Sequence, residues 1–390
     1  MSKYRFVNGQ LITEEGICAS DLLVSDGQIE AIIPREQKTG AEYEIVDCTG
    51  LYVSPGFVDV HQHGGGGSDY MDVDPDAYFH ATEAHLRHGT TSVMPTLLSA
   101  DEKNIHRAVD AYLQATRDPR IRANLLGIHV EGPYISPAQA GAQKPEHIRD
   151  FAPEEYRRIW ERSQGHIKRW SVAPEVKGAK AFADFAKQQG IALSIAHSNA
   201  DMDRVEEAFD WGFTHVTHFY SCISTITRKG GFRVPGVLEA AYYLDDMAVE
   251  LIADGCRLPL SLLRYVCKFK KFETISLVTD AMRAAGQEAK ESFLGSMDDP
   301  LPVIVEDGVA KLTDRSAFAG SVATADRLVA NMVSAGVPLV EAVKMITVNP
   351  LKAMGLDVKK GRIQCGYDAD LCIFDEAIAV KAVFCKGQPV

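Results

Sequence analysis

The sequence predicts an α/β protein: a (β/α)8 TIM-like barrel with a small β-sandwich domain built from both termini. Between residues 55 and 354, eight short apolar segments alternate with amphipathic helical segments, and acidic or histidine side chains follow most of the apolar segments. Strands that alternate with helices favour a parallel sheet, and eight such strands can close into a barrel. A doubly wound open sheet is the alternative arrangement.

The two ends of the chain predict the small domain. Residues 1–54 carry an Asn-Gly pair at 8–9 and an Asp-Gly pair at 26–27, which are turn signals between short strands. Residues 355–390 have the same strand-and-turn character. Because neither segment is large enough to bury a core alone, we expect one β domain from residues 1–54 and 355–390, beside a barrel at residues 55–354.

The apolar segments predict the barrel strands at residues 57–61, 91–96, 125–131, 167–174, 191–197, 215–219, 249–254 and 275–280. Periodicity between them predicts helices that include residues 76–87, 102–115, 154–162, 179–188 and 202–211. We expect His85 and His88, near the end of the first helix, to lie on the surface. No Gly-x-Gly-x-x-Gly motif follows the first strand, and there is no Walker phosphate loop, which disfavours a dinucleotide-binding fold.

Composition excludes several classes of protein. The chain has 390 residues, of which 46% are hydrophobic and 24% charged, as in ordinary globular proteins. A net charge of −12 argues against a nucleic-acid partner, but a few arginines can still hold a small anionic substrate. No apolar run approaches the roughly 20 residues that span a membrane, and no signal-like core follows the amino terminus. We expect a cytoplasmic protein without a membrane partner, whose eight scattered cysteines are reduced.

A pair of histidines ends the first barrel strand. His61 and His63 close the segment 57–63 and are followed by four glycines at residues 64–67. Side chains two residues apart on a strand point to the same face, so the two imidazoles can hold one divalent metal. The glycines allow a sharp turn and leave space above the pair. Two satisfied polar histidines at a strand end are the alternative interpretation.

Acidic and histidine side chains also follow other predicted strands, at Glu131, Glu175, His197, His218, Asp254 and Asp280. In an α/β barrel the carboxyl ends of the strands converge on one mouth, where active sites are built. We therefore expect a centre of one metal with spare ligands, or of two metals bridged by Glu131, made by His61, His63, Glu131, His197, His218 and Asp280. His129, inside an apolar run, is expected to be structural.

These residue types predict hydrolytic chemistry. Neutral imidazoles and anionic carboxylates bind a metal, and a catalytic site keeps one position open for water. The metal would lower the pKa of that water and polarise a substrate carbonyl. Asp280 could take the water proton and later give it to a leaving amine. Four histidines favour zinc or another late first-row divalent ion over magnesium.

The motifs that carry these residues lie at 55–64, 129–133, 196–198, 217–218 and 278–281. They resemble the amidohydrolase superfamily and, within it, the N-acetylglucosamine-6-phosphate deacetylase family, over a stretch from about residue 5 to the carboxyl terminus. The resemblance implies that Glu131, His197 and His218 bind the main metal and that Asp280 is the acid/base. Retention of His61 and His63 makes a two-metal site plausible. The family uses either zinc or iron, so one or two ions of either metal are expected.

The resemblance also implies substrate contacts. Arg233, in the segment 232–236, stands where the family holds the sugar phosphate, and its planar guanidinium suits phosphate oxygens. A solvated loop arginine is the alternative. Residues Ala319, Gly320 and Ser321 resemble a loop of small residues that packs near the acetyl group. A simple tight turn would have the same composition.

Three positions depart from the family pattern. Ser221-Cys222 replaces an Asn-Ala pair, so a main-chain contact can survive but an asparagine side-chain contact cannot. Arg257 replaces a histidine and keeps a cation, and Gln143 replaces a histidine and can still bond a hydroxyl. These departures make the sequence less informative about the preferred sugar than about the reaction.

The predicted function is metal-dependent removal of acetate from an N-acetyl-hexosamine 6-phosphate, with N-acetylglucosamine 6-phosphate as the first candidate. Family likeness also implies a homodimer, with a phosphate contact that can cross its interface. Two alternatives stay open. The chain could be another amidohydrolase that acts on a cyclic amide such as a hydantoin or on an N-acyl amino acid, or a non-catalytic sugar-phosphate-binding barrel.

Overall fold

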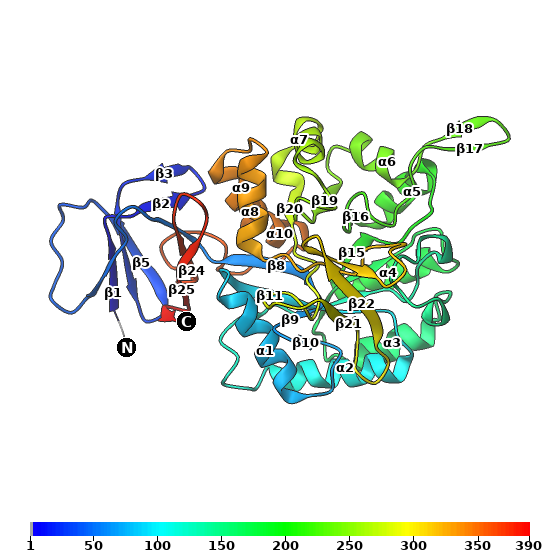
Figure 1. Ribbon diagram of the computed structural model, residues 1–390, viewed down its shortest axis with the longest axis horizontal. Helices are drawn as coiled ribbons and strands as arrows, with labels where there is room; N and C mark the ends of the chain where they lie inside the picture. The colour runs from blue at the N-terminus through cyan, green and yellow to red at the C-terminus, as the bar shows by residue number, and fades with distance from the viewer. Residues whose placement is uncertain (1–2) are drawn as a thin grey trace.

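The computed structural model describes residues 3–390 (Figure 1), so Met1 and Ser2 of the predicted amino-terminal segment lie outside the described residues. Within that range, eight parallel strands pair in chain order around a barrel. They are β8 (Phe57–Gln62), β11 (Thr90–Leu97), β13 (Ile128–Glu131), β14 (Ile167–Val172), β15 (Ala192–Ile195), β16 (Phe213–Val216), β19 (Ala248–Leu251) and β20 (Ile275–Leu277). All eight predicted barrel strands are confirmed.

The first and last strands meet just beyond their carboxyl ends. The Asp280 amide, three residues past β20, donates to the His61 carbonyl of β8 at 2.9 Å. Below it, the Thr279 hydroxyl donates to the buried Asp59 carboxylate at 2.5 Å. These bonds bring the last strand round to the first, so the barrel is nearly closed and the open-sheet alternative is wrong.

The helices lie outside the strands (Figure 1) and are α1 (Pro75–Leu86), α2 (Glu102–Ala115), α3 (Pro153–Arg162), α4 (Ala179–Gln189), α5 (Met202–Trp211), α6 (Val237–Tyr243), α7 (Leu260–Phe269), α8 (Ala325–Ser334), α9 (Leu339–Met345) and α10 (Val348–Ala353). Their ends follow local chemistry. The Asp101 carboxylate caps α2 by accepting from the Asn104 amide at 2.8 Å. Gly212, at φ +108°, ends α5 in the left-handed conformation that suits glycine.

Each predicted helix is confirmed to within one residue at both ends. The surface position predicted for His85 is wrong, because its side chain is buried and its Nε2 lies 2.9 Å from the Gly64 carbonyl oxygen. The last turn of α1 packs on the glycine turn of β9 (Gly64–Gly65) and β10 (Ser68–Asp69), which covers that ring. His88 is partly exposed and bonds Asp326 at 2.9 Å.

The chain termini together build the small β-sandwich, at the left of Figure 1. One sheet has the order β5 (Gln28–Ile33), β4 (Asp21–Ser25), β1 (Lys3–Val7), β6 (Glu44–Asp47). The other has the order β26 (Gln388–Pro389), β25 (Val380–Cys385), β24 (Leu371–Phe374), β7 (Tyr52–Pro55), β2 (Gln10–Thr13), β3 (Gly16–Cys18). The rings of Phe6 and Phe384, from opposite ends of the chain, pack edge-on at 4.9 Å. The domain boundaries at residues 54–55 and 354–355 stay a prediction.

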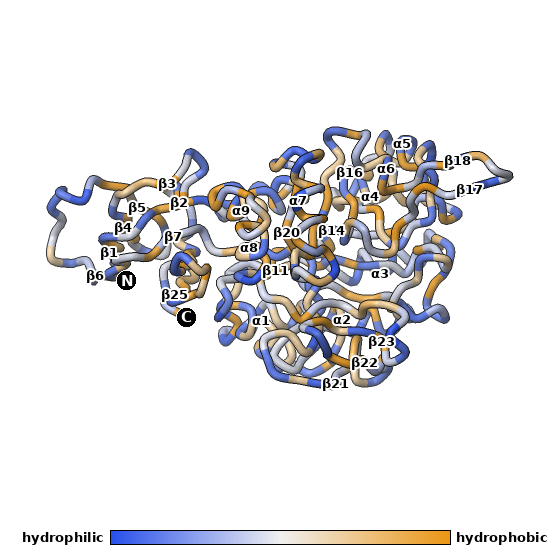
Figure 2. Tube along the Cα trace, turned by 45° about the horizontal axis from the view of Figure 1, so that its top comes forward, coloured by the Kyte–Doolittle hydropathy of each residue, from blue (hydrophilic) through white to orange (hydrophobic). Residues whose placement is uncertain are grey.

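Two additions to the barrel were not predicted. A three-stranded antiparallel sheet of β21 (Glu291–Leu294), β22 (Leu301–Glu306) and β23 (Val309–Leu312) follows β20. A hairpin of β17 (Thr227–Lys229) and β18 (Phe232–Val234) projects from the body beyond α5 and α6, at the upper right of Figure 1. Figure 2 shows hydrophobic segments gathered in the barrel and hydrophilic segments along many outer loops. Among residues 3–390, no helix combines the length and apolar character that a membrane span requires.

Candidate metal centre

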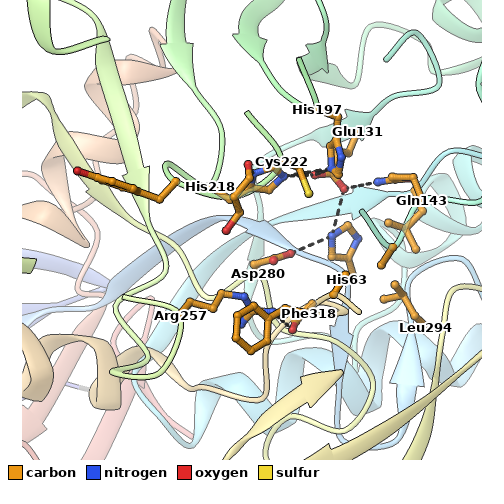
Figure 3. Close-up of a pocket in the computed structure, with 16 residues that line it drawn as sticks. His63, Glu131, Gln143, His197, His218, Cys222, Arg257, Asp280, Leu294 and Phe318 are labelled. Carbon is orange, nitrogen blue, oxygen red and sulfur yellow. Dashed lines mark hydrogen bonds and ion pairs between the residues drawn. The ribbon is translucent and has the colours of Figure 1, made fainter. Parts of the chain in front are cut away.

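Six buried side chains meet at the carboxyl ends of the barrel strands, and Figure 3 shows all of them except His61. They form two groups of three, and within each group the candidate ligand atoms lie within 4.8 Å of one another. We call Glu131, His197 and His218 the first group, and His61, His63 and Asp280 the second group. The structure therefore brings together every side chain that the sequence predicts as a metal ligand.

Glu131 belongs to the first group and also faces the second. Its Oε1 is 3.0 Å from Nε2 of His218 and 3.4 Å from Nε2 of His197. The same oxygen is 3.6 Å from Nε2 of His61, and Oε2 is 3.5 Å from Nε2 of His63. Asp280 closes the second group, with Oδ1 3.2 Å from His63 Nε2. A carboxylate that faces four imidazoles is placed to bridge two cations.

Hydrogen bonds fix the ring orientation in the first group. Nδ1 of His197 lies 2.7 Å from the Gln139 carbonyl oxygen, and Nδ1 of His218 lies 3.1 Å from that of Ser221. A carbonyl oxygen only accepts, so both Nδ1 atoms donate and each neutral ring presents a lone pair at Nε2. These two Nε2 atoms are 3.2 Å apart and face the Glu131 carboxylate. Converging lone pairs beside an anion fit a bound cation.

The second group also has the geometry of a cation site. Nδ1 of His61 lies 3.0 Å from the Glu250 carboxylate and donates to it. Its Nε2 is buried without a hydrogen-bond partner among the described residues, and faces Glu131 and Asp280. An unpaired buried nitrogen is costly in a protein interior, and a metal ion would satisfy it.

The electrostatics keep the carboxylates ionised. Burial raises the pKa of Glu131, but the imidazoles of His197, His218 and His61 around its carboxylate outweigh burial and hold that pKa well below its ordinary value. Burial likewise opposes ionisation of Asp280, and the hydrogen bond from His63 outweighs it and lowers the pKa. Burial disfavours charge on His63 too, but Asp280 and Glu131 raise its pKa to about 9. A proton and a metal ion therefore compete for the ring of His63.

Three of these side chains are aimed by an unusual backbone conformation. His197, His218 and Asp280 have φ values of +46°, +32° and +48°, in a region that non-glycine residues rarely adopt. They lie two to three residues past the ends of β15, β16 and β20. Such strain clusters at functional sites, and here it turns each side chain toward the barrel mouth.

Five of the six candidate ligands, all except His61, line a pocket of about 270 Å³ (Figure 3). Five predicted substrate residues line it, namely Gln143, Ser221, Cys222, Arg257 and Gly320. Ala319 and Ser321 are buried behind the wall, where the Ser321 amide donates to the Asp280 carbonyl oxygen at 2.6 Å. Arg233 does not line the pocket, because it lies on the projecting hairpin.

Two of the pocket residues are already engaged. Gln143 Nε2 donates to Glu131 Oε2 at 2.8 Å, and its Oε1 accepts from the Ser99 amide at 3.0 Å. Arg257 pairs with the Asp254 carboxylate at 3.0 Å, donates to the Gly320 carbonyl and lies over the Phe318 ring. Gln143 thus holds the carboxylate of a candidate ligand in place. Arg257 links Asp254 to Gly320 and Phe318 of the pocket wall.

Sequence reasoning also named strand-end residues that lie outside the pocket lining. Glu175 accepts from the Ser198 hydroxyl at 2.8 Å and does not line the pocket. His129 is buried between the hydroxyls of Thr96 and Ser171, at 3.0 and 2.6 Å, which fits a structural role.

Sequence reasoning missed Glu250 and Arg169, a fully buried ion pair beneath the centre. The available signal was a charged residue in the middle of an apolar strand, which is rare unless the charge is paired. It also missed Phe318 and Leu294 in the pocket wall, which no motif marks.

Comparison with known proteins agrees with this centre. Residues 52–390 match the Amidohydrolase family. The chain is 31% identical to the N-acetylgalactosamine-6-phosphate deacetylase of Escherichia coli O157:H7 over 97% of both chains. It is also 31% identical to the N-acetylglucosamine-6-phosphate deacetylase of Lysinibacillus sphaericus, over 94% of this chain and 92% of the relative.

Solved structures give the same result. An aspartate-to-alanine mutant of the N-acetyl-D-glucosamine-6-phosphate deacetylase of Mycobacterium smegmatis, in complex with N-acetyl-D-glucosamine-6-phosphate, is 29% identical and superposes with a TM-score of 0.91. That match covers 100% of this chain and 99% of the mycobacterial chain. The deacetylase of Pasteurella multocida also gives a TM-score of 0.91, at 28% identity and the same coverage. This chain therefore belongs to the amidohydrolase family of metal-dependent hydrolases, among its N-acetylglucosamine-6-phosphate deacetylases.

Proposed function

We propose that the protein removes acetate from an N-acetyl-hexosamine 6-phosphate, with N-acetylglucosamine 6-phosphate as the first substrate to test. The observation that carries the proposal is the convergence of Glu131, His197 and His218 on one point, next to the ionised Asp280. Relatives that act on glucosamine and on galactosamine derivatives both match the chain, so the configuration of the sugar is part of the test.

Zinc or iron would be held by the first group, and a second ion by the second group with Glu131 as the bridge. When bound, such an ion activates water and polarises the acyl carbonyl. Gln143 holds the Glu131 carboxylate in place through its amide. The apolar side chains of Leu98 and Leu294 line the pocket and limit the access of bulk water.

Asp280 is the proposed acid/base. Its side chain is in the pocket wall and its lowered pKa leaves it ionised at neutral pH, ready to accept a proton from the attacking water. Returning that proton to the leaving amine completes amide cleavage. Its main chain is fixed on both sides, by the bond to the His61 carbonyl and by the Ser321 amide. This fixed backbone keeps the carboxylate at one place in the pocket wall.

Phosphate recognition is proposed to need a homodimer. Arg233 is exposed on the hairpin β17–β18 and does not line the pocket of its own chain. The hairpin projects from the body, and its Phe232 is 79% exposed, an aromatic surface that a second chain would bury. We place Arg233 of one protomer at the sugar phosphate bound by its partner, and the enzyme in the cytoplasm.

A mixing experiment tests the dimer. Arg233→Ala and Asp280→Asn variants are each expected to be nearly inactive, and a heterodimer places an intact Asp280 beside an intact Arg233 in one of its two sites. Random mixing is expected to restore about a quarter of the parent activity. No recovery on mixing, with dimers shown by sedimentation, would place Arg233 in its own site or outside any site.

A substrate panel tests the activity itself. The metal-reconstituted protein is assayed with N-acetylglucosamine 6-phosphate, N-acetylgalactosamine 6-phosphate, unphosphorylated N-acetylglucosamine, N-acyl amino acids and a hydantoin. We expect acetate release from a phosphorylated sugar and much lower kcat/KM without the phosphate. Preference for an amino acid or a hydantoin would favour another amidohydrolase activity. Tight binding without turnover of any substrate would favour the non-catalytic barrel.

A further inference from the structure

A fully buried glutamate lies directly beneath the metal centre. The carboxylate of Glu250, in the middle of β19, accepts three hydrogen bonds. Its Oε2 accepts from Nδ1 of His61 at 3.0 Å and from the main-chain amide of His218 at 3.1 Å. Its Oε1 accepts from the guanidinium of Arg169. One oxygen of Glu250 therefore touches both groups of the centre.

Arg169 is held as rigidly as its partner. This fully buried side chain of β14 donates to the Thr217 hydroxyl at 2.9 Å, the Ser194 hydroxyl at 3.0 Å and the Val60 carbonyl at 3.2 Å. Burial alone would raise the pKa of Glu250, but the charge of Arg169 outweighs burial and holds it well below the ordinary value. An ionised and immobile acceptor thus lies below the ring of His61.

The two groups depend on this acceptor to different degrees. The ring of His218 is oriented by the Ser221 carbonyl, and Glu250 touches only the His218 main chain. Among the described residues, the ring of His61 makes one hydrogen bond, which its Nδ1 donates to Glu250, because its Nε2 has no partner. A carboxylate behind a metal-binding imidazole fixes its tautomer and raises its basicity.

We propose that Glu250 is a positioning residue that makes His61 a metal ligand, so that the ion held by the second group depends on it while the ion held by the first group does not. The inference rests on the proposed function only in that the centre binds metal. Glu250 does not line the substrate pocket, so its effect should reach substrate only through the second ion.

The variant Glu250→Gln tests the proposal sharply. All three partners of Glu250 are donors, so the amide of glutamine must place its own donor against one of them. Chelated protein is titrated with Zn²⁺ by equilibrium dialysis, and with Co²⁺ by visible absorption. The parent should bind two ions per chain. In the variant the weaker ion should lose about 10–100-fold in affinity, with the first ion unchanged.

Two further variants keep the test decisive. Glu155→Gln makes the same change in another buried glutamate, paired with Arg149 in and beside α3, and should leave both ions unchanged. Glu250→Asp keeps the charge that Arg169 requires but withdraws the carboxylate from His61, so it should weaken the second ion even where Glu250→Gln fails to fold.

The outcomes separate cleanly. A parent that binds two ions and Glu250 variants that bind both as tightly would overturn the inference. A parent that binds one ion would also overturn it, because the second group would hold no metal, and would leave the proposed activity standing. A parent that binds none would overturn the proposed function along with the inference.

Discussion

The two groups of the metal centre are held by different parts of the molecule. In the first group, each histidine is oriented by a main-chain carbonyl, Gln139 for His197 and Ser221 for His218. In the second group, His61 is oriented by the side chain of Glu250 on a distant strand, and Nδ1 of His63 has no partner within residues 3–390. The first group is therefore set by the backbone, and the second by a buried side-chain network.

This difference predicts which group should keep its metal ion when nearby side chains are substituted. Main-chain carbonyls are present whatever the side chains are, so the first group tolerates substitution around it. The second group relies on specific partners, and loss of one leaves a ring free to turn. We expect the first group to bind its ion more tightly and to retain it after changes that empty the second.

Glu131→Gln should have the largest effect, because the Glu131 carboxylate faces the imidazoles of both groups. A neutral amide removes several kcal/mol of attraction for the metal, so turnover should fall by at least about a thousandfold. Metal analysis should find both ions lost. Retention of the second ion alone would mean that the two groups do not share Glu131, and that the second group binds its ion without this carboxylate.

Asp280→Asn should come next. Removing a general acid/base costs about 10²–10⁴-fold in kcat. Because Asp280 belongs to the second group, the first ion should remain, which metal analysis of the purified variant can verify. Unchanged turnover would refute the acid/base role, and loss of both ions would show that the groups are not separable.

A matched pair of histidine variants tests the asymmetry directly. His197→Asn removes a ring of the first group and should abolish tight metal binding. His63→Asn removes a ring of the second group, whose Nδ1 is unsupported within the described chain, and should cost about 10–100-fold in affinity for the second ion only. Equal losses of metal affinity in the two variants would mean that the two groups do not differ in how firmly they hold their ions.

Much of this arrangement could be predicted from sequence. Eight apolar segments and five periodic helices define the barrel because their period reflects which face is buried. The ligands could be predicted because the carboxyl ends of the strands converge in such a fold, so a residue at a strand end is expected at the mouth of the barrel. Residues 291–312 escaped prediction because their strands are partly exposed and show no clean alternation.

The supporting contacts could not be predicted. The partner of His61 is 189 residues away, and no spacing rule links Glu250 to that ring. Burial of His85 depended on the glycine turn that packs over it. The hydrogen bond from Gln143 to Glu131 was not predicted, because the path of a long loop decides where its side chains point.

That contact of Gln143 supplies the smallest predicted effect. Gln143→Ala removes a hydrogen bond to an ionised carboxylate, which is worth about 1.5–3 kcal/mol, while the carboxylate keeps its imidazole neighbours. We expect both ions to remain at saturating metal, with kcat reduced by roughly tenfold. Gln139→Ala is a matched control, because only the main chain of Gln139 bonds His197 and its partly exposed side chain donates to Asn199 instead. A larger loss in Gln139→Ala than in Gln143→Ala would mean that the loop as a whole, rather than one side chain, holds the first group.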